Sequence, residues 1–189
     1  MESQIDRQDE TKVQKTSWTL DTAHSRLQFL VRHMLISEVS GHFNSYSMSV
    51  STAGDNFDTT EVEVSIDVQS IDTGVPGRDD HLRSADFFDA EKYPKMTFKS
   101  IKLKELDDNR YKLTGSMTIK DITKTIELDL TYGGQATDKQ GIQRAGFKAM
   151  GVINRFDHDI KWNKLIETGN AIVGRHILFT CNIELIKQK

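Results

Sequence analysis

The chain has 189 residues, a formal net charge of −3 and a single cysteine. This length is typical of one domain with a core of its own, and one cysteine excludes an intramolecular disulfide. Scattered lysines and arginines under a negative balance argue against nucleic acid as a partner, and no run approaches the roughly 18 apolar residues of a membrane-spanning helix, so we expect no stable membrane insertion.

The N-terminal segment, residues 1–16, is polar and has no periodicity, and we expect a flexible arm before a barrel domain over residues 17–189. The arm lacks the apolar stretch of a signal peptide. This absence predicts a cytoplasmic protein.

Alternation of apolar and polar residues predicts β-strands from Trp18 onward. A strand from Arg26 follows the first, then a turn over 34–40 and a strand over 41–51. The clearest strand covers residues 61–71. Its apolar positions, which alternate with charged and polar ones, are Val62, Val64, Ile66 and Val68. This pattern indicates a sheet that is buried on one face and wet on the other.

Residues 73–98 interrupt the alternation. Gly74 and Pro76 end a strand, and Asp79 stands where a short helix could begin, with its carboxylate accepting from free backbone N–H groups. Leu82 and Phe88 follow near helical spacing. We predict a short helix at about 78–90 that plugs one end of a barrel.

Strands resume after Pro94. Ile101 is out of phase with Phe98, which predicts a bulge near Ser100. Residues 111–132 have the pattern of a hairpin that turns at Lys120-Asp121. A strand follows the polar loop that ends near Gln143, residues 155–174 are irregular, and the last strand alternates to Leu185.

About eight or nine antiparallel strands predict an all-β fold. We favour an extended, lipocalin-like, eight-stranded barrel over a sandwich because closure removes the exposed sheet edges. Eight strands leave an interior just wide enough for one small ligand, and the apolar inward positions require that ligand to be apolar and narrow. A packed core and a lined tunnel have the same periodicity, so a structural or interaction protein with a filled barrel is an alternative.

Six histidines and the acidic residues near His81 raise a second alternative, a metal-dependent enzyme. The histidines lack metal-site spacing, and the chain has no nucleophile elbow, P-loop or dinucleotide fingerprint. Cys181 falls in the apolar register of the last strand and is expected to be a buried small side chain. We predict no enzyme activity, no catalytic residues, no metal ligands and no cofactor.

Ordered sequence blocks over residues 17–186 resemble the YceI-like family of polyisoprenoid-binding proteins. The blocks are Trp18-x-Leu20-Asp21-x-x-His24-Ser25, Phe29-x-Val31-x-His33-Met34, Gly41-x-Phe43, Thr73-Gly74, Arg78-Asp79, His81-Leu82-Arg83-Ser84, Asp86-Phe87-Phe88-Asp89, Tyr93-Pro94, Phe98-x-Ser100, Gly115-x-Met117-Thr118-Ile119, Thr123-Lys124 and Ile153-Asn154-Arg155. The resemblance implies a barrel whose tunnel holds a polyisoprenoid, an isoprenoid quinone or a fatty-acid derivative, without catalysis, in a homodimer.

Three positions depart from the pattern of that family. Asp121 replaces a usual glycine in a hairpin turn, Phe156-Asp157-His158-Asp159 replaces an Asp-Phe-Gly-like turn, and Arg175-His176 stands where an aspartate is usual. The last two lie at expected loop ends and therefore affect the mouth of the tunnel.

The predicted ligand-binding residues are inward apolar side chains together with polar residues near the mouth. They are Phe29, Val31, His33, Phe43, Val64, Ile66, His81, Phe87, Phe88, Phe98, Met117, Ile119, Leu128, Phe147, Ile153, Arg155, Ile177 and Phe179. With His24, the polar members His33, His81 and Arg155 are expected to orient a head group.

Overall fold

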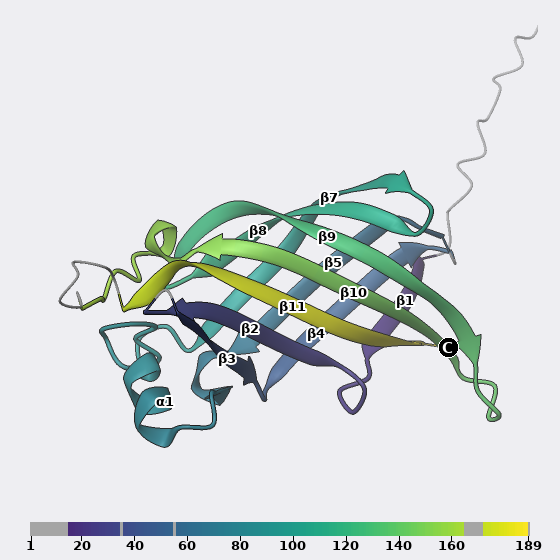
Figure 1. The fold of residues 1–189 in the computed structure, drawn as a ribbon. Coiled ribbons are helices and arrows are strands. Elements are labelled where there is room, and N and C mark those ends of the chain that lie inside the picture. The colour runs from purple at the N-terminus through teal and green to yellow at the C-terminus, as the bar shows by residue number, and fades with distance from the viewer. Residues whose placement is uncertain (1–14, 35, 55, 165–171, 189) are drawn as a thin grey trace, which may run out of the picture.

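The computed structural model describes residues 15–34, 36–54, 56–164 and 172–188. Within these ranges the chain forms eleven strands, one α-helix and two short 3-10 helices (Figure 1). The strands are β1 (Lys15–Leu20), β2 (Arg26–His33), β3 (Ser37–Phe43), β4 (Tyr46–Ala53), β5 (Asn56–Asp67), β6 (Ile71–Asp72), β7 (Lys95–Asp107), β8 (Arg110–Ile119), β9 (Ile122–Thr137), β10 (Gln143–Asn154) and β11 (Val173–Lys187). The helices are α1 (Pro76–Arg83), η1 (Val68–Ser70) and η2 (Arg155–His158).

Eight of these strands close a barrel. The hydrogen-bonded order is β1-β4-β5-β7-β8-β9-β10-β11, and β11 pairs back to β1. Every pair is antiparallel. β11 is long enough to have two partners on this side: Leu185–Lys187 pair with β1, and Val173–Asn182 pair with β2, which continues the sheet into β3 and β6. The predicted eight-stranded antiparallel barrel is confirmed.

Two predicted irregularities are also confirmed. The pairing of β7 with β8 shifts between Ser100 and Lys102, and the intervening Ile101 is 62% exposed on the outside. β8 and β9 turn at Lys120 and Asp121, whose φ angles are 51° and 55°. Two successive left-handed residues match the twist of a two-residue hairpin, and aspartate is among the side chains that tolerate this conformation.

Several element boundaries differ from the prediction. The expected strand over 41–51 is two strands, since the backbone N–H groups of Asn44 and Ser45 leave the ladder and donate to Ser70. The expected turn over 34–40 is already β3 from Ser37 onward. The strand expected over 61–71 ends at Asp67, whose carboxylate accepts from Gln69 N and caps η1.

Two further stretches, one at the start of the described chain and one before β11, also have bounds other than those predicted. β1 begins at Lys15, earlier than the predicted Trp18, and residues 1–14 of the predicted arm lie outside the described residues. Part of the irregular stretch predicted over 155–174 also lies outside them.

Helix α1 is shorter than the predicted 78–90 and begins earlier. Pro76 occupies the first turn, where its missing N–H is not needed, and the helix ends at Arg83. Asp79 does not cap it; one carboxylate oxygen accepts from the backbone N–H (2.9 Å) and the hydroxyl (2.5 Å) of Thr73. This side chain therefore fastens α1 to the strand end before it.

Different elements lie at the two ends of the barrel, and α1 is at one of them (Figure 1). At the end near β1, which we call the aromatic end, the rings of Trp18, Phe57, Tyr132 and Phe147 contact one another at centroid distances of 5.0–5.5 Å. At the opposite helix end lie α1, the turns after it and the residues that follow η2. Phe87 contacts Trp162 there at 5.1 Å. The predicted location of the helix at one barrel end is correct.

Candidate functional site: an apolar cavity inside the barrel

A cavity of about 250 Å³ lies inside the barrel. Nearly all of its wall consists of apolar side chains on the inward positions of the strands. The wall residues that the sequence also predicted are Phe29, Val31, Phe43, Val64, Ile66, Phe87, Phe88, Phe98, Met117, Ile119, Leu128, Phe147, Ile153, Arg155, Ile177 and Phe179. His33 and His81 are outside this wall. Whether any of these residues contacts a ligand stays a prediction.

Strand β11 shows that the barrel is hollow along its middle. Ile177, Phe179 and Cys181 point inward, yet each is only half-buried, whereas Ile183 and Leu185 on the same face are 8% and 2% exposed. All five line the cavity, so the exposed surface of the first three faces the cavity. The barrel is therefore open in its middle and packed toward the aromatic end.

More than half of the wall lies outside the predicted ligand-binding residues, although alternation placed several members, such as Val62 and Cys181, on an apolar strand face. The wall residues outside that set are Leu27, Met48, Val50, Phe57, Thr60, Val62, Ile71, Leu82, Met96, Leu103, Tyr111, Leu113, Ile126, Leu130, Ala149, Ile160, Val173, Cys181, Ile183 and Leu185. Most share a face with a predicted residue in an alternating strand, and alternation would have found them. Phe57 and Ile160 carried no such signal, because neither lies in a stretch of clear alternation.

Cys181 behaves as part of the apolar wall. Burial raises the pKa of its thiol to about 12. The thiol is therefore protonated at neutral pH, and a protonated thiol is neither a good nucleophile nor a metal ligand. The apolar register predicted for Cys181 is correct, but the side chain is half-buried because it faces the cavity.

Arg155 links several backbone segments at the helix end of the cavity by hydrogen bonds. It is 3% exposed, and its guanidinium donates to the backbone oxygens of Ile160 (2.7 Å), Trp162 (2.9 Å), Val173 (3.2 Å) and Gly174 (2.9 Å). Burial lowers the pKa of Arg155. Bonding to buried carbonyl oxygens ties η2 to the start of β11, which is a role that the sequence did not suggest. Orientation of a head group by Arg155 stays a prediction.

The polar residues expected at one mouth lie at two ends of the barrel. His81 contacts the Trp162 ring at 4.7 Å and pairs with Asp86 at 2.8 Å, so it lies at the helix end with Arg155. His24 lies near Glu184, about ten residues along β11 from the Gly174 oxygen that Arg155 holds. At about 3.3 Å per residue the two sites are about 33 Å apart. The expectation that His24 shares a mouth with His81 and Arg155 is wrong.

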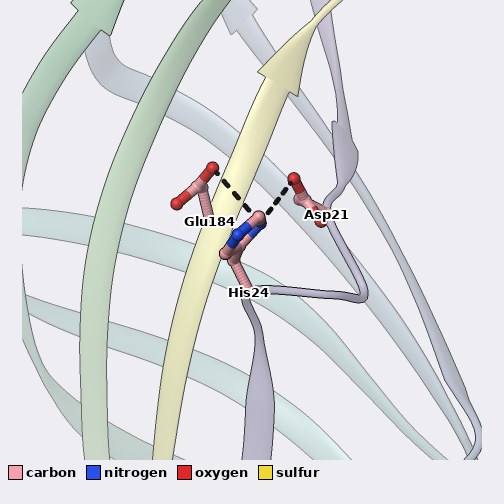
Figure 2. Close-up of side chains that lie close together, drawn as sticks. All are labelled: Asp21, His24 and Glu184. Atoms are coloured by element: carbon pink, nitrogen blue, oxygen red, sulfur yellow. Dashed lines mark hydrogen bonds and ion pairs between the residues drawn. The ribbon is translucent and has the colours of Figure 1, made fainter.

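One cluster of the described residues has the composition of a metal site. Asp21, His24 and Glu184 bring ligand atoms within 4.8 Å of one another, and Figure 2 shows the His24 ring between the two carboxylates. Nη1 of Arg144 lies 2.5 Å from Asp21 and 2.7 Å from Glu184. The guanidinium already bonds to both carboxylates, so the cluster is an ion network that joins the turn between β1 and β2 to β10 and β11 outside the cavity.

Around His81, the predicted centre of a metal-dependent enzyme, no group of three such residues gathers within the described part of the chain. The Asp86 carboxylate is 2.8 Å from its ring, and the other contacts of that ring are aromatic. This environment is typical of a histidine that packs a barrel end.

Asp21 is expected to make stability depend on pH. Hydrogen bonds from His24 and then Arg144 outweigh burial and lower the pKa of its carboxyl from 3.8 to about 2. Because the pKa is depressed in the folded state, this stabilisation is complete above about pH 4 and is lost as the pH falls through about 2. We expect Asp21→Asn to lower the free energy of unfolding by about 1 kcal/mol at neutral pH, and the difference from wild type to disappear as the pH falls through about 2.

Urea denaturation at a series of pH values measures this difference. Asp108→Asn, at the exposed turn between β7 and β8, removes the same charge and serves as the control. A constant difference between Asp21→Asn and wild type from neutral pH to acid would contradict the role given to Asp21.

Comparison with known proteins identifies the family of this chain. The model of the YceI-like domain matches residues 18–185. The chain belongs to the YceI-like domain family. A curated relative, the UPF0312 protein SA2479 of Staphylococcus aureus, is 34% identical over 170 residues, which cover 89% of this chain and 96% of that protein. Among the described residues of this YceI-like protein, no helix has the length and apolar character needed to cross a membrane.

Solved structures share the fold of this YceI-like chain. The Campylobacter jejuni YCEI protein has a TM-score of 0.72 at 32% identity, covering 84% of this chain and 90% of that one. Burkholderia cenocepacia BcnA has a TM-score of 0.76 at 24% identity, with coverage of 87% and 98%. A polyisoprenoid binding domain from Saccharophagus degradans has a TM-score of 0.66 at 17% identity, with coverage of 89% and 97%. The last two likenesses concern the fold alone.

Proposed function

We propose that this protein binds a long-chain amphiphilic lipid in the barrel cavity, for storage or transport and without catalysis. A polyisoprenoid, an isoprenoid quinone and a fatty-acid derivative are the candidate ligands. The observation that carries the proposal is the hollow middle of the barrel, where inward apolar side chains keep exposed surface. The polyisoprenoid binding domain with the same fold gives it additional support.

The size and chemistry of the cavity favour a slender tail. A volume of about 250 Å³ is slightly smaller than the pockets of about 300–1,000 Å³ that hold drug-sized molecules. Each buried methylene stabilises the complex by about 0.8 kcal/mol, so affinity is expected to rise with tail length until the cavity is filled. We place the head group at the helix end, because the polar side chains of His81, Asp86 and Lys164 lie there beside the aromatic rings.

Mass spectrometry of the freshly purified protein tests the proposal, first in its native state and then after organic extraction. We expect one co-purifying lipid per chain, and a displacement series of fatty acids in which affinity rises with tail length. A protein that carries no lipid and takes up neither quinones nor fatty acids would overturn the proposal. Such a result would return the filled barrel and, after elemental analysis, the metal-dependent enzyme as candidates. The homodimer and the cytoplasmic location stay predictions.

A further inference from the structure

Three glycines on the inner wall of the barrel lie beneath phenylalanine rings from neighbouring strands. A Cβ atom at Gly41 would lie 2.3 Å from Cζ of Phe29. At Gly115 the corresponding distance to Phe98 is 2.2 Å, and at Gly151 the distance to Phe179 is 2.5 Å. Real Cβ atoms do not approach other atoms so closely, so each ring occupies the space that any other side chain would need.

Glycine is required at these three positions because a Cβ atom would clash with a ring, and not because of the backbone conformation. None of the three has a φ angle in the left-handed region, and each lies within a regular strand. Glycine within a strand weakens it, and it commonly marks a close approach by another group. The group is here the same each time, an inward phenylalanine. The rings line the cavity and the glycines do not, so the rings cover the glycines.

Two of the pairs form one continuous row across four strands. Gly151 on β10 pairs with Phe179 on β11, which pairs with Phe29 on β2, which in turn pairs with Gly41 on β3. The Phe179 ring leans toward β10 and the Phe29 ring toward β3. The two adjacent rings therefore lean away from each other and lie along the wall, and lumen is left between them.

We propose that this glycine–phenylalanine row sets the width of the cavity and so selects amphiphiles with a single slender tail. With any larger residue at position 41 or 151, the facing ring would have to rise from the wall into the lumen. The selection of a ligand rests on the proposed lipid-binding function, whereas the control of width does not.

Gly151→Ala is the sharpest test. The three atoms nearest its Cβ position belong to the side chains of Phe179 and Leu128, so these side chains can move without a shift of the backbone. Gly115 is less suitable because the backbone oxygen of Lys99 lies 2.7 Å from its Cβ position. Gly146→Ala is the matched control, since it lies on the same strand and has no atom within 4 Å of its Cβ position. Gly151→Ala/Phe179→Leu is the rescue, because leucine has no ring to displace.

Two readouts separate cavity width from lipid binding. Xenon binding to the lipid-free protein reports the empty apolar volume. It should fall in Gly151→Ala, stay unchanged in Gly146→Ala and recover in the double variant. Affinity is measured with palmitic acid and phytanic acid, whose main chains are equally long but of which only the second carries methyl branches. Gly151→Ala should weaken the binding of palmitic acid by about tenfold, which is the effect of losing one or two methylene contacts. It should weaken the binding of phytanic acid by more.

Unchanged xenon binding in Gly151→Ala, or a loss that Phe179→Leu does not restore, would overturn the control of width. If Gly151→Ala weakened the binding of both acids by the same factor, the proposed selection of slender tails would be wrong. A wild-type protein that binds neither acid while xenon follows the expected pattern would remove the lipid-binding function and leave the control of width supported.

Discussion

Arg155→Met is expected to lower the free energy of unfolding by about 3 kcal/mol. The substitution leaves the backbone oxygens of Ile160, Trp162 and Gly174 without the guanidinium donor, and each buried acceptor left unpaired costs about 1 kcal/mol or more. The Val173 oxygen keeps the hydrogen bond that Nδ2 of Asn163 donates. Removal of a buried cation offsets part of this loss. Urea denaturation measures the total, and hydrogen exchange at residues 155–162 and 173–174 should show that the helix end opens first.

Arg175→Met is the matched control for that experiment. Arg175 and Arg155 both lie over the Phe156 ring, at 4.8 and 4.7 Å, but Arg175 is exposed. We expect the control to change the free energy of unfolding by less than about 0.5 kcal/mol. Arg155→Lys keeps the charge but has one nitrogen for four oxygens, so it should recover only part of the loss. Equal effects of Arg155→Met and Arg175→Met would show that the backbone contacts of Arg155 contribute nothing.

Ala149→Phe is expected to weaken the binding of a long-chain fatty acid by about 70-fold. Ala149 is 8% exposed and lies in the cavity wall. A phenyl ring at this position would take about 100 Å² of contact from the tail, which at about 25 cal/mol per Å² is about 2.5 kcal/mol. Because the ring enters space that is already empty, the free energy of unfolding should change by less than about 1.5 kcal/mol.

Met150→Phe separates this blockage from a general effect of the larger side chain. Met150 is the next residue of β10 and points outward, with 37% of its surface exposed. Its affinity for the fatty acid should stay within about twofold of wild type, and urea denaturation should confirm that both variants are folded. If Ala149→Phe binds as tightly as Met150→Phe, the tail does not lie in this cavity.

Alternation along the strands was enough to predict the barrel, but fewer than half of its wall residues were among those predicted to bind a ligand. Val62, Val64 and Ile66 have an unambiguous period of two, and the phase slip at Ser100 correctly indicated a bulge. Boundaries decided by distant partners were missed. The break between β3 and β4 depends on hydrogen bonds to Ser70, about 25 residues further along the chain, and no local pattern encodes such a contact.

The hollow middle of the barrel could not be predicted from the sequence for a related reason. Whether Phe179 crosses the lumen or lies along the wall depends on the residue opposite it, and that residue is Gly151 on another strand. The structural role of Arg155 was also missed, because a cation in a polar turn does not reveal that the folded chain surrounds it with its own carbonyl oxygens. Sequence patterns report which way a side chain points, but not what it meets there.

The two-partner pairing of β11 has a consequence for the order of folding. The seam of the barrel joins Trp18 near the start of the described chain to Lys187 near its end. The barrel cannot close until β11 has been synthesised, and contacts so distant in sequence slow the folding of β-proteins to milliseconds or longer. Until then the strands that precede β11 cannot enclose the apolar cavity.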